Sequence, residues 1–133
     1  MAAGKYSFTI EQGATVDFEI AYKDSNGSPI DLTGYQARMQ LRPSPGSDTL
    51  YLTLSSSLDP CGTGLNMGGA GGTNPPTSGT IGIYISAISS SQLNFDLASY
   101  DLEISSGSGN CYIVNRLLEG RVKLSKEVTE GLY

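Results

Sequence analysis

The stretch from Gly34 to Arg42, "GYQARMQLR", is the most regular part of this 133-residue sequence. Apolar and polar side chains alternate through it without an error, and the apolar ones are Tyr35, Ala37, Met39 and Leu41. Successive side chains of a β-strand point to opposite faces, so this pattern is typical of a strand with one face in a core. The stretch therefore predicts a strand whose polar face, with Arg38 and Arg42, points outward.

The same two-residue period recurs along the chain, separated by turn residues such as Asn26-Gly27. The further segments are 8–10, 16–22, 50–54, 81–85, 100–104 and 118–124. About seven strands at this spacing predict an all-β fold of two antiparallel sheets packed face to face. A small, partly open barrel is the alternative. The length fits a single domain that spans residues 1–133.

Between residues 55 and 78 the alternation disappears, in "SSSLDPCGTGLNMGGAGGTNPPTS". Such a length is unusual for a connection inside a compact domain, and its glycines lose much entropy when they are ordered. We expect one long, flexible Gly/Pro-rich loop over 55–78, which a partner would order.

Two local features give narrower predictions. The segment "SAISSSQLNF", residues 86–95, predicts one or two helical turns with Ser86 as the N-cap and with Ile88, Leu93 and Phe95 facing inward. Gly120 interrupts the last strand, which indicates a bulge or a close approach of another backbone segment.

The composition argues against catalysis. The chain has no histidine, which removes the commonest general base near neutral pH and every nucleophile–histidine pair. Acidic pairs such as Asp17 with Glu19 and Asp101 with Glu103 fall in the polar phase of strands, where solvated faces explain them. We predict no catalytic residues and a protein that is not an enzyme.

No segment matches a cofactor or metal site well. The glycine-rich run "GTGLNMGGAGG" lacks the Lys-Ser/Thr ending of a phosphate loop. Asp24, Asn26 and Asp31 have a loosely calcium-like spacing without the terminal glutamate, and Asx turns are the favoured explanation. Two cysteines without histidine fall short of four soft ligands. We predict no cofactor and no metal.

The formal net charge of −5, from 8 basic and 13 acidic residues, argues against nucleic acid and anionic membranes as partners. No apolar run reaches the ~18 residues of a transmembrane helix, and the N-terminal residues lack the apolar core of a secretory signal. We therefore expect synthesis in a cytoplasm, where Cys61 and Cys111 stay reduced. A disulfide between these two cysteines, formed after release from a cell, is the alternative.

Four arginines are candidate partner contacts, namely Arg38, Arg42, Arg116 and Arg121. Arginine is enriched at protein interfaces, where its planar group pairs with carboxylates. Solubility and the protection of sheet edges explain the same residues without a partner, and the pattern alone does not separate the two interpretations.

The order of five segments resembles a family of small tail and baseplate proteins from tailed bacteriophages and prophages. Its motifs are F-T-I-x-Q-G-A-T, D-L-T-G-Y-x-A-R-M-x-x-R, G-x-I-x-x-x-I-S, Y-D-L-E and R-L-L-x-G-x-V. They correspond here to residues 8–15, 31–42, 79–86, 100–103 and 116–122. The layout is also similar to the N-terminal domain of siphophage upper baseplate proteins.

This resemblance implies an immunoglobulin-like β-sandwich that serves as a structural subunit of a virion, at the tail baseplate. It implies multiple symmetric copies that assemble with other tail proteins, made in the cytoplasm of the bacterial host. The segments before Tyr6 and after Val128, with the 55–78 loop, are candidate arms. A head-decoration protein and a carbohydrate-binding module for host attachment remain alternatives, the latter weakened by the absence of tryptophan.

Overall fold

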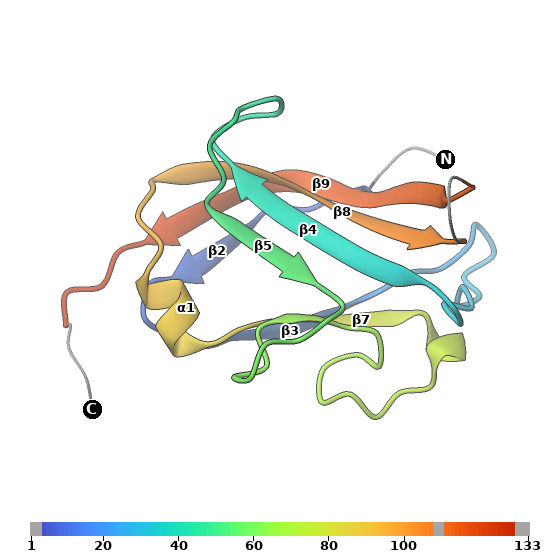
Figure 1. Cartoon of the computed structure of the whole chain (residues 1–133). Helices are drawn as coiled ribbons and strands as arrows, with labels where there is room; N and C mark the ends of the chain where they lie inside the picture. Colours follow the sequence, from blue (N-terminus) through green and yellow to red (C-terminus); the bar gives the residue numbers. More distant parts are fainter. Residues whose placement is uncertain (1–3, 108–110, 130–133) are drawn as a thin grey trace.

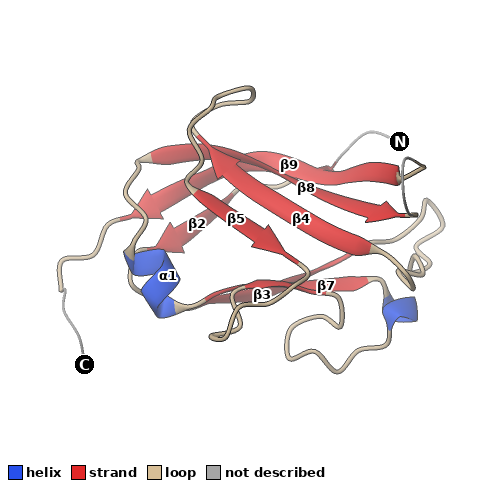
Figure 2. Cartoon of the chain, in the orientation of Figure 1, coloured by secondary structure: helices blue, strands red, loops and turns tan. Residues whose placement is uncertain are grey.

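The structure is a computed structural model that describes residues 4–107 and 111–129, and its strands form two packed layers (Figures 1 and 2). The larger sheet has the order β1-β9-β8-β4-β5, with β2 also beside β9. The smaller sheet has the order β3-β7-β6. The larger sheet comprises β1 (Gly4–Lys5), β2 (Phe8–Glu11), β4 (Gln36–Arg42), β5 (Leu52–Ser55), β8 (Leu97–Ser106) and β9 (Ile113–Ser125). The smaller sheet comprises β3 (Val16–Ala21), β6 (Gly64–Asn66) and β7 (Thr80–Ile85).

One apolar core lies between the two sheets. In β4 the buried residues are Ala37, Met39 and Leu41, as the alternation predicts. They meet the inner faces of β8 and β7, which contribute Tyr100, Leu102, Ile104, Ile81, Ile83 and Ile85. The predicted all-β sandwich of immunoglobulin-like type is confirmed by this arrangement, and the barrel alternative is wrong because the sheets stay separate.

Two pairings depart from the antiparallel rule. β1 and β2 both run parallel to β9. After β2 the chain turns at Gly13, whose φ of 83° suits glycine, and β3 enters the other sheet instead of forming a hairpin with β2. Side-chain alternation reports which face is buried and not which strand is the neighbour, so the sequence did not indicate this parallel edge.

Gly120 marks a close approach, as predicted. A Cβ atom at this position would lie 2.0 Å from the carbonyl oxygen of Tyr6, where the N-terminal segment passes β9. Three residues earlier, the β8–β9 register shifts between Leu102 and Glu103, which face Leu118 and Arg116. Leu117 is therefore the extra residue of a β-bulge, and its side chain is buried.

The 55–78 segment differs from the expected loop without secondary structure. It contains β6, whose Leu65 is fully buried, and the single 3-10 turn Pro76–Ser78. Residues 67–73 then fold back over β7, where Gly69 and Ala70 lie against Gly82. Three strand residues are too few to give a visible period, and the glycines allow the backbone segments to meet closely.

Helix α1 (Ala87–Ser91) closes one end of the sandwich (Figure 1). Ser86 is the N-cap, with its Oγ accepting from the backbone N–H of Ser89 at 3.3 Å, and Leu93 and Phe95 are buried, as predicted. The prediction for Ile88 is wrong: this side chain is exposed because the five-residue helix turns Ser90 inward instead. In the described part of the chain, no helix is long and apolar enough to cross a membrane.

Candidate protein interface

The outer face of the larger sheet carries polar side chains in regular rows. The register places Arg38, Glu103 and Arg116 in one row across β4, β8 and β9. Gln40, Asp101 and Glu119 form the next row, and Arg42, Ser99 and Arg121 form a third. Directly opposed residues of neighbouring strands share a face, so all four predicted arginines lie together on this surface. We call this surface, made of the three rows, the outer face.

Ion pairs run within the first row and between the first and second rows. The Nε of Arg38 donates to Oε1 of Glu103, and Arg116 lies 3.4 Å from Asp101 and 4.0 Å from Glu119. Lys5 lies 3.5 Å from the same Glu119. The basic side chains are largely exposed and the acidic ones partly so, with Glu103 the most covered at 20% exposure, so each pair contributes about 1 kcal/mol or less to stability. Their charges nearly balance, and the pairs can exchange partners at low cost.

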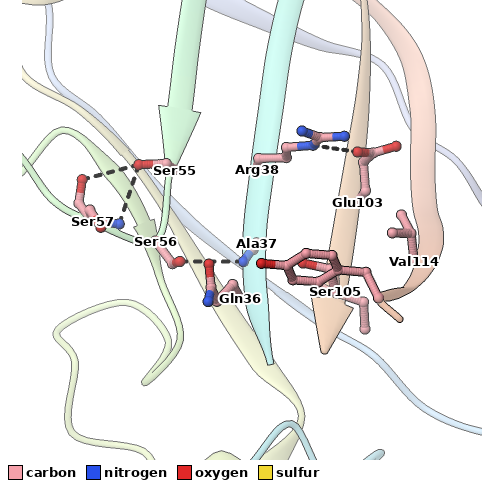
Figure 3. A pocket seen from close by; sticks show the side chains of 11 residues that line it. Gln36, Ala37, Arg38, Ser55, Ser56, Ser57, Glu103, Ser105 and Val114 are labelled. Atoms are coloured by element: carbon pink, nitrogen blue, oxygen red, sulfur yellow. Dashed lines mark hydrogen bonds and ion pairs between the residues drawn. The ribbon is translucent and has the colours of Figure 1, made fainter. Parts of the chain in front are cut away.

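A hollow of about 460 Å³ lies at one end of the outer face, beside Arg38, Glu103, Ser105 and Val114 (Figure 3). Apolar side chains gather at this end. Tyr112, just before β9, and Val114 both line the hollow and are 56% and 49% exposed, and Ile113 between them is 61% exposed on the opposite face of the sheet, in register with Ser106. A polar row of ion pairs that ends in an exposed apolar hairpin has the mixed composition of a protein interface.

Sequence reasoning missed this apolar hairpin. The two-residue period predicts the last strand only over 118–124, so the sequence pattern gives residues 112–114 no role of their own. In the structure Ile113 and Val114 pair with Ser106 and Ser105, beyond the buried residues of β8. The usable signal was the unbroken apolar run "CYIV", because a strand with one core face should alternate.

The arginines differ in how strongly their own chain holds them. Arg42 donates to the carbonyl oxygen of Ser47 at 3.0 Å and to the side-chain oxygen of Gln40 at 2.9 Å. It therefore braces the β4–β5 turn in addition to lining the outer face. Arg38 is 70% exposed at the rim of the hollow, which makes it the better placed of the two for a partner.

The remaining sequence candidates do not join a common site. Cys61 and Cys111 are both exposed, free thiols. The carboxylate of Asp24 accepts from the backbone N–H groups of Asn26 and Ser28, which is the Asx-turn pattern. Asp31 accepts from the hydroxyl and the backbone N–H of Thr33, and these hydrogen bonds hold the pKa of Asp31 below its usual value. Among the described residues, no three potential ligands gather around a metal position.

Comparison with known proteins gives a fold likeness only. No family model matches this sequence, and no curated protein matches it. Among solved structures, a marsupial T cell receptor is similar over 92% of this chain, at 17% identity and a TM-score of 0.48. This chain spans about a third (34%) of the length of that receptor chain.

Proposed function

We propose that this protein is a non-enzymatic structural subunit of a bacteriophage virion, a tail baseplate component that assembles with other tail proteins. One observation carries the proposal: the outer face presents four arginines in two rows beside an exposed apolar hairpin. Interfaces combine such arginines with apolar anchors. Catalysis would instead need convergent titratable groups in a cleft.

The order of the motifs supports the same proposal. The five segments that resemble the phage family fall on β2 and its turn, on β4, on β7, on β8 and on β9. These elements supply most of the core and the whole outer face. In the proposed role, the core keeps the sheet rigid while Arg38 and Arg116 exchange their internal carboxylates for those of a neighbour.

The experiment begins with purified virions from a strain that produces this protein, in which mass spectrometry should find the chain at a fixed ratio to other tail proteins. The variant Arg38→Glu with Val114→Asp places unfavourable groups at the hollow. We expect about tenfold lower incorporation into particles, because buried unpaired charges at an interface are costly.

Lys126→Glu is the matched control. Lys126 is also an exposed cation in an ion pair, 3.2 Å from Asp96, but it lies outside the outer face. The Lys126→Glu variant should be incorporated into particles as efficiently as the natural protein. The proposal fails if the chain is missing from purified virions, or if the double variant is incorporated normally.

A further inference from the structure

The strand β3 has one open edge. In the part of the chain that the structure describes, β3 pairs with β7 alone and ends the smaller sheet. Tyr22, just beyond β3, donates its backbone N–H to Gly79, which lies opposite it across the ladder. Residues alternate in an antiparallel ladder between those bonded to the partner and those facing away. The backbone groups of Asp17, Glu19 and Ala21 therefore point to the open edge.

Half-exposed apolar side chains lie next to this edge, where the smaller sheet meets the N-terminal segment of the larger sheet. We call this boundary, between Phe18 of β3 and the rings of Tyr6 and Phe8, the seam. Phe18 and Ile20 of β3 face the core but are only partly buried. Across the seam, the ring of Phe8 lies 5.2 Å from that of Phe18, and the ring of Tyr6, 46% exposed, lies 6.2 Å from it. A strand added beside β3 would bury these side chains further, so the edge offers apolar contact as well as backbone pairing.

Charge decides what kind of strand fits. Asp17 and Glu19 are exposed on the outward side of β3, and one carboxylate oxygen of Glu19 accepts from the backbone N–H of Ala70 at 3.0 Å, which leaves its other oxygen for a partner. A second copy pairing through its own β3 would place these carboxylates near one another, which is unfavourable for opposed residues. A segment with lysine or arginine at alternate positions would instead place cations beside both carboxylates, and its other residues would lie over the seam.

We propose that the β3 edge binds an extended segment of a neighbouring protein in which basic and apolar residues alternate. Backbone hydrogen bonds to residues 17, 19 and 21 would extend the smaller sheet by one strand, the mode of recognition known as β-augmentation. Insofar as the neighbour is another virion protein, this inference rests on the proposed function. The edge itself is defined by the structure alone.

The test uses the full 133-residue chain and a synthetic peptide of alternating lysine and valine, about eight residues long to match a short strand. Binding should slow amide hydrogen exchange at residues 17, 19 and 21. Two control peptides should not bind: one alternates glutamate with valine, and one has the lysines grouped at one end. Equal binding of the grouped peptide would mean simple charge attraction and would overturn the proposal.

Glu19→Pro removes one edge-facing N–H together with a carboxylate, and proline is tolerated on edge strands, so we expect about tenfold weaker peptide binding than in Glu19→Gln, which removes the charge alone. Thr53→Pro is the matched control. Thr53 lies on β5, which forms an edge of the larger sheet. The backbone N–H of Ser56 bonds to Ala37 of β4, and because bonded residues alternate along the ladder, the N–H of Thr53, three residues before, points to the open edge. This control should bind the peptide normally.

A second variant covers the case in which Glu19→Pro does not fold. Asp17→Lys with Glu19→Lys keeps every backbone N–H of β3 and loses only the bond from the Ala70 N–H, and it should reverse the preference, so that the glutamate–valine peptide binds and the lysine–valine peptide does not. An unchanged preference would overturn the proposal. If the chain binds the peptide but is missing from virions, the β3 site stands and the virion role is rejected. If the chain is present in virions but binds neither peptide, the virion role stands and the β3 site is rejected.

Discussion

The outer surfaces of the two sheets are built in opposite ways. On the larger sheet, β4 and β8 alternate between buried and accessible residues, and their polar side chains stay open to solvent. On the smaller sheet, β7 is buried at nearly every position, because residues 67–73 cover its outer surface as well. The difference shows how one chain covers one sheet with its own loop and leaves the other sheet available to a partner.

The residue patterns of the central strands β7 and β4 explain this contrast. β7 reads "TIGIYI", with isoleucine in the inward phase and Thr80, Gly82 and Tyr84 in the outward phase. Gly82 leaves room for the backbone of Gly69 and Ala70. β4 places glutamine and arginine at every outward position, and these side chains cannot be covered without loss of hydration. An outward glycine thus marks the covered strand, and long polar or charged residues at every outward position mark the open one.

The largest effect should separate the two faces of β4. Met39 is fully buried, so Met39→Ala should lower the free energy of unfolding by about 3 kcal/mol through lost burial and a residual cavity. Its neighbour Gln40 lies on the outer face, so Gln40→Ala should change stability by no more than about 0.5 kcal/mol. Urea unfolding of both variants measures the difference. Similar losses would show that the outer face is also part of the packed structure.

The next largest effect on stability should come from the smaller sheet, where residues 67–73 cover β7. A Cβ atom at Gly82 would lie 2.7 Å from both the carbonyl carbon and the oxygen of Gly69, which are backbone atoms. Gly82→Ala should therefore cost about 2 kcal/mol and displace residues 67–73 from β7. Limited proteolysis should then cut the loop faster than in the natural protein. Gly71→Ala is the control in the same loop, where a Cβ meets no atom within 4 Å and only the positive φ of 84° opposes the change. A loop equally resistant in Gly82→Ala would contradict the packing described here.

Prediction from sequence succeeded where one side of a strand faces the core and the other faces water. β4 and β8 were located by alternation because each inward residue has a polar neighbour. β6 was missed because three residues cannot show a period. The arginines were found one at a time, but their gathering into rows depends on strand register, which a single sequence does not encode visibly. The apolar hairpin at Tyr112 was missed because apolar character was equated with burial.

A smaller effect concerns the inner face of the larger sheet, where Tyr100 carries a polar atom into the seam. Its hydroxyl donates to the carbonyl oxygen of Tyr6, and Tyr100→Phe should lose about 1 kcal/mol with that hydrogen bond. Burial, with a smaller contribution from the nearby Tyr6, raises the pKa of Tyr100 to about 12.

This pKa shift also predicts a pH dependence. Up to about pH 10 the phenol is protonated in both the folded and the unfolded chain, so its contribution to stability is complete. Between pH 10 and 12 the unfolded chain loses the proton first, and stability falls as the pH rises. Unfolding of Tyr100→Phe should depend less on pH in this window. Tyr112→Phe, at an exposed position, should keep the natural dependence, and identical slopes for the two variants would contradict the role given to Tyr100.

The smallest effect on stability should come from the outer face itself. Arg38 is 70% exposed in its pair with Glu103, so Arg38→Ala should change the free energy of unfolding by about 0.5 kcal/mol or less, and less still in high salt. A double-mutant cycle with Glu103→Gln measures the coupling between the two side chains. A coupling of 2 kcal/mol or more, as in buried pairs, would show that the row mainly stabilises this chain. A weak coupling together with lost incorporation into particles would separate binding from folding, because the ion pair would then matter only where a partner excludes water. That outcome would complete the contrast with β7, whose outward residue Gly82 is covered by Gly69 and Ala70 of the chain itself.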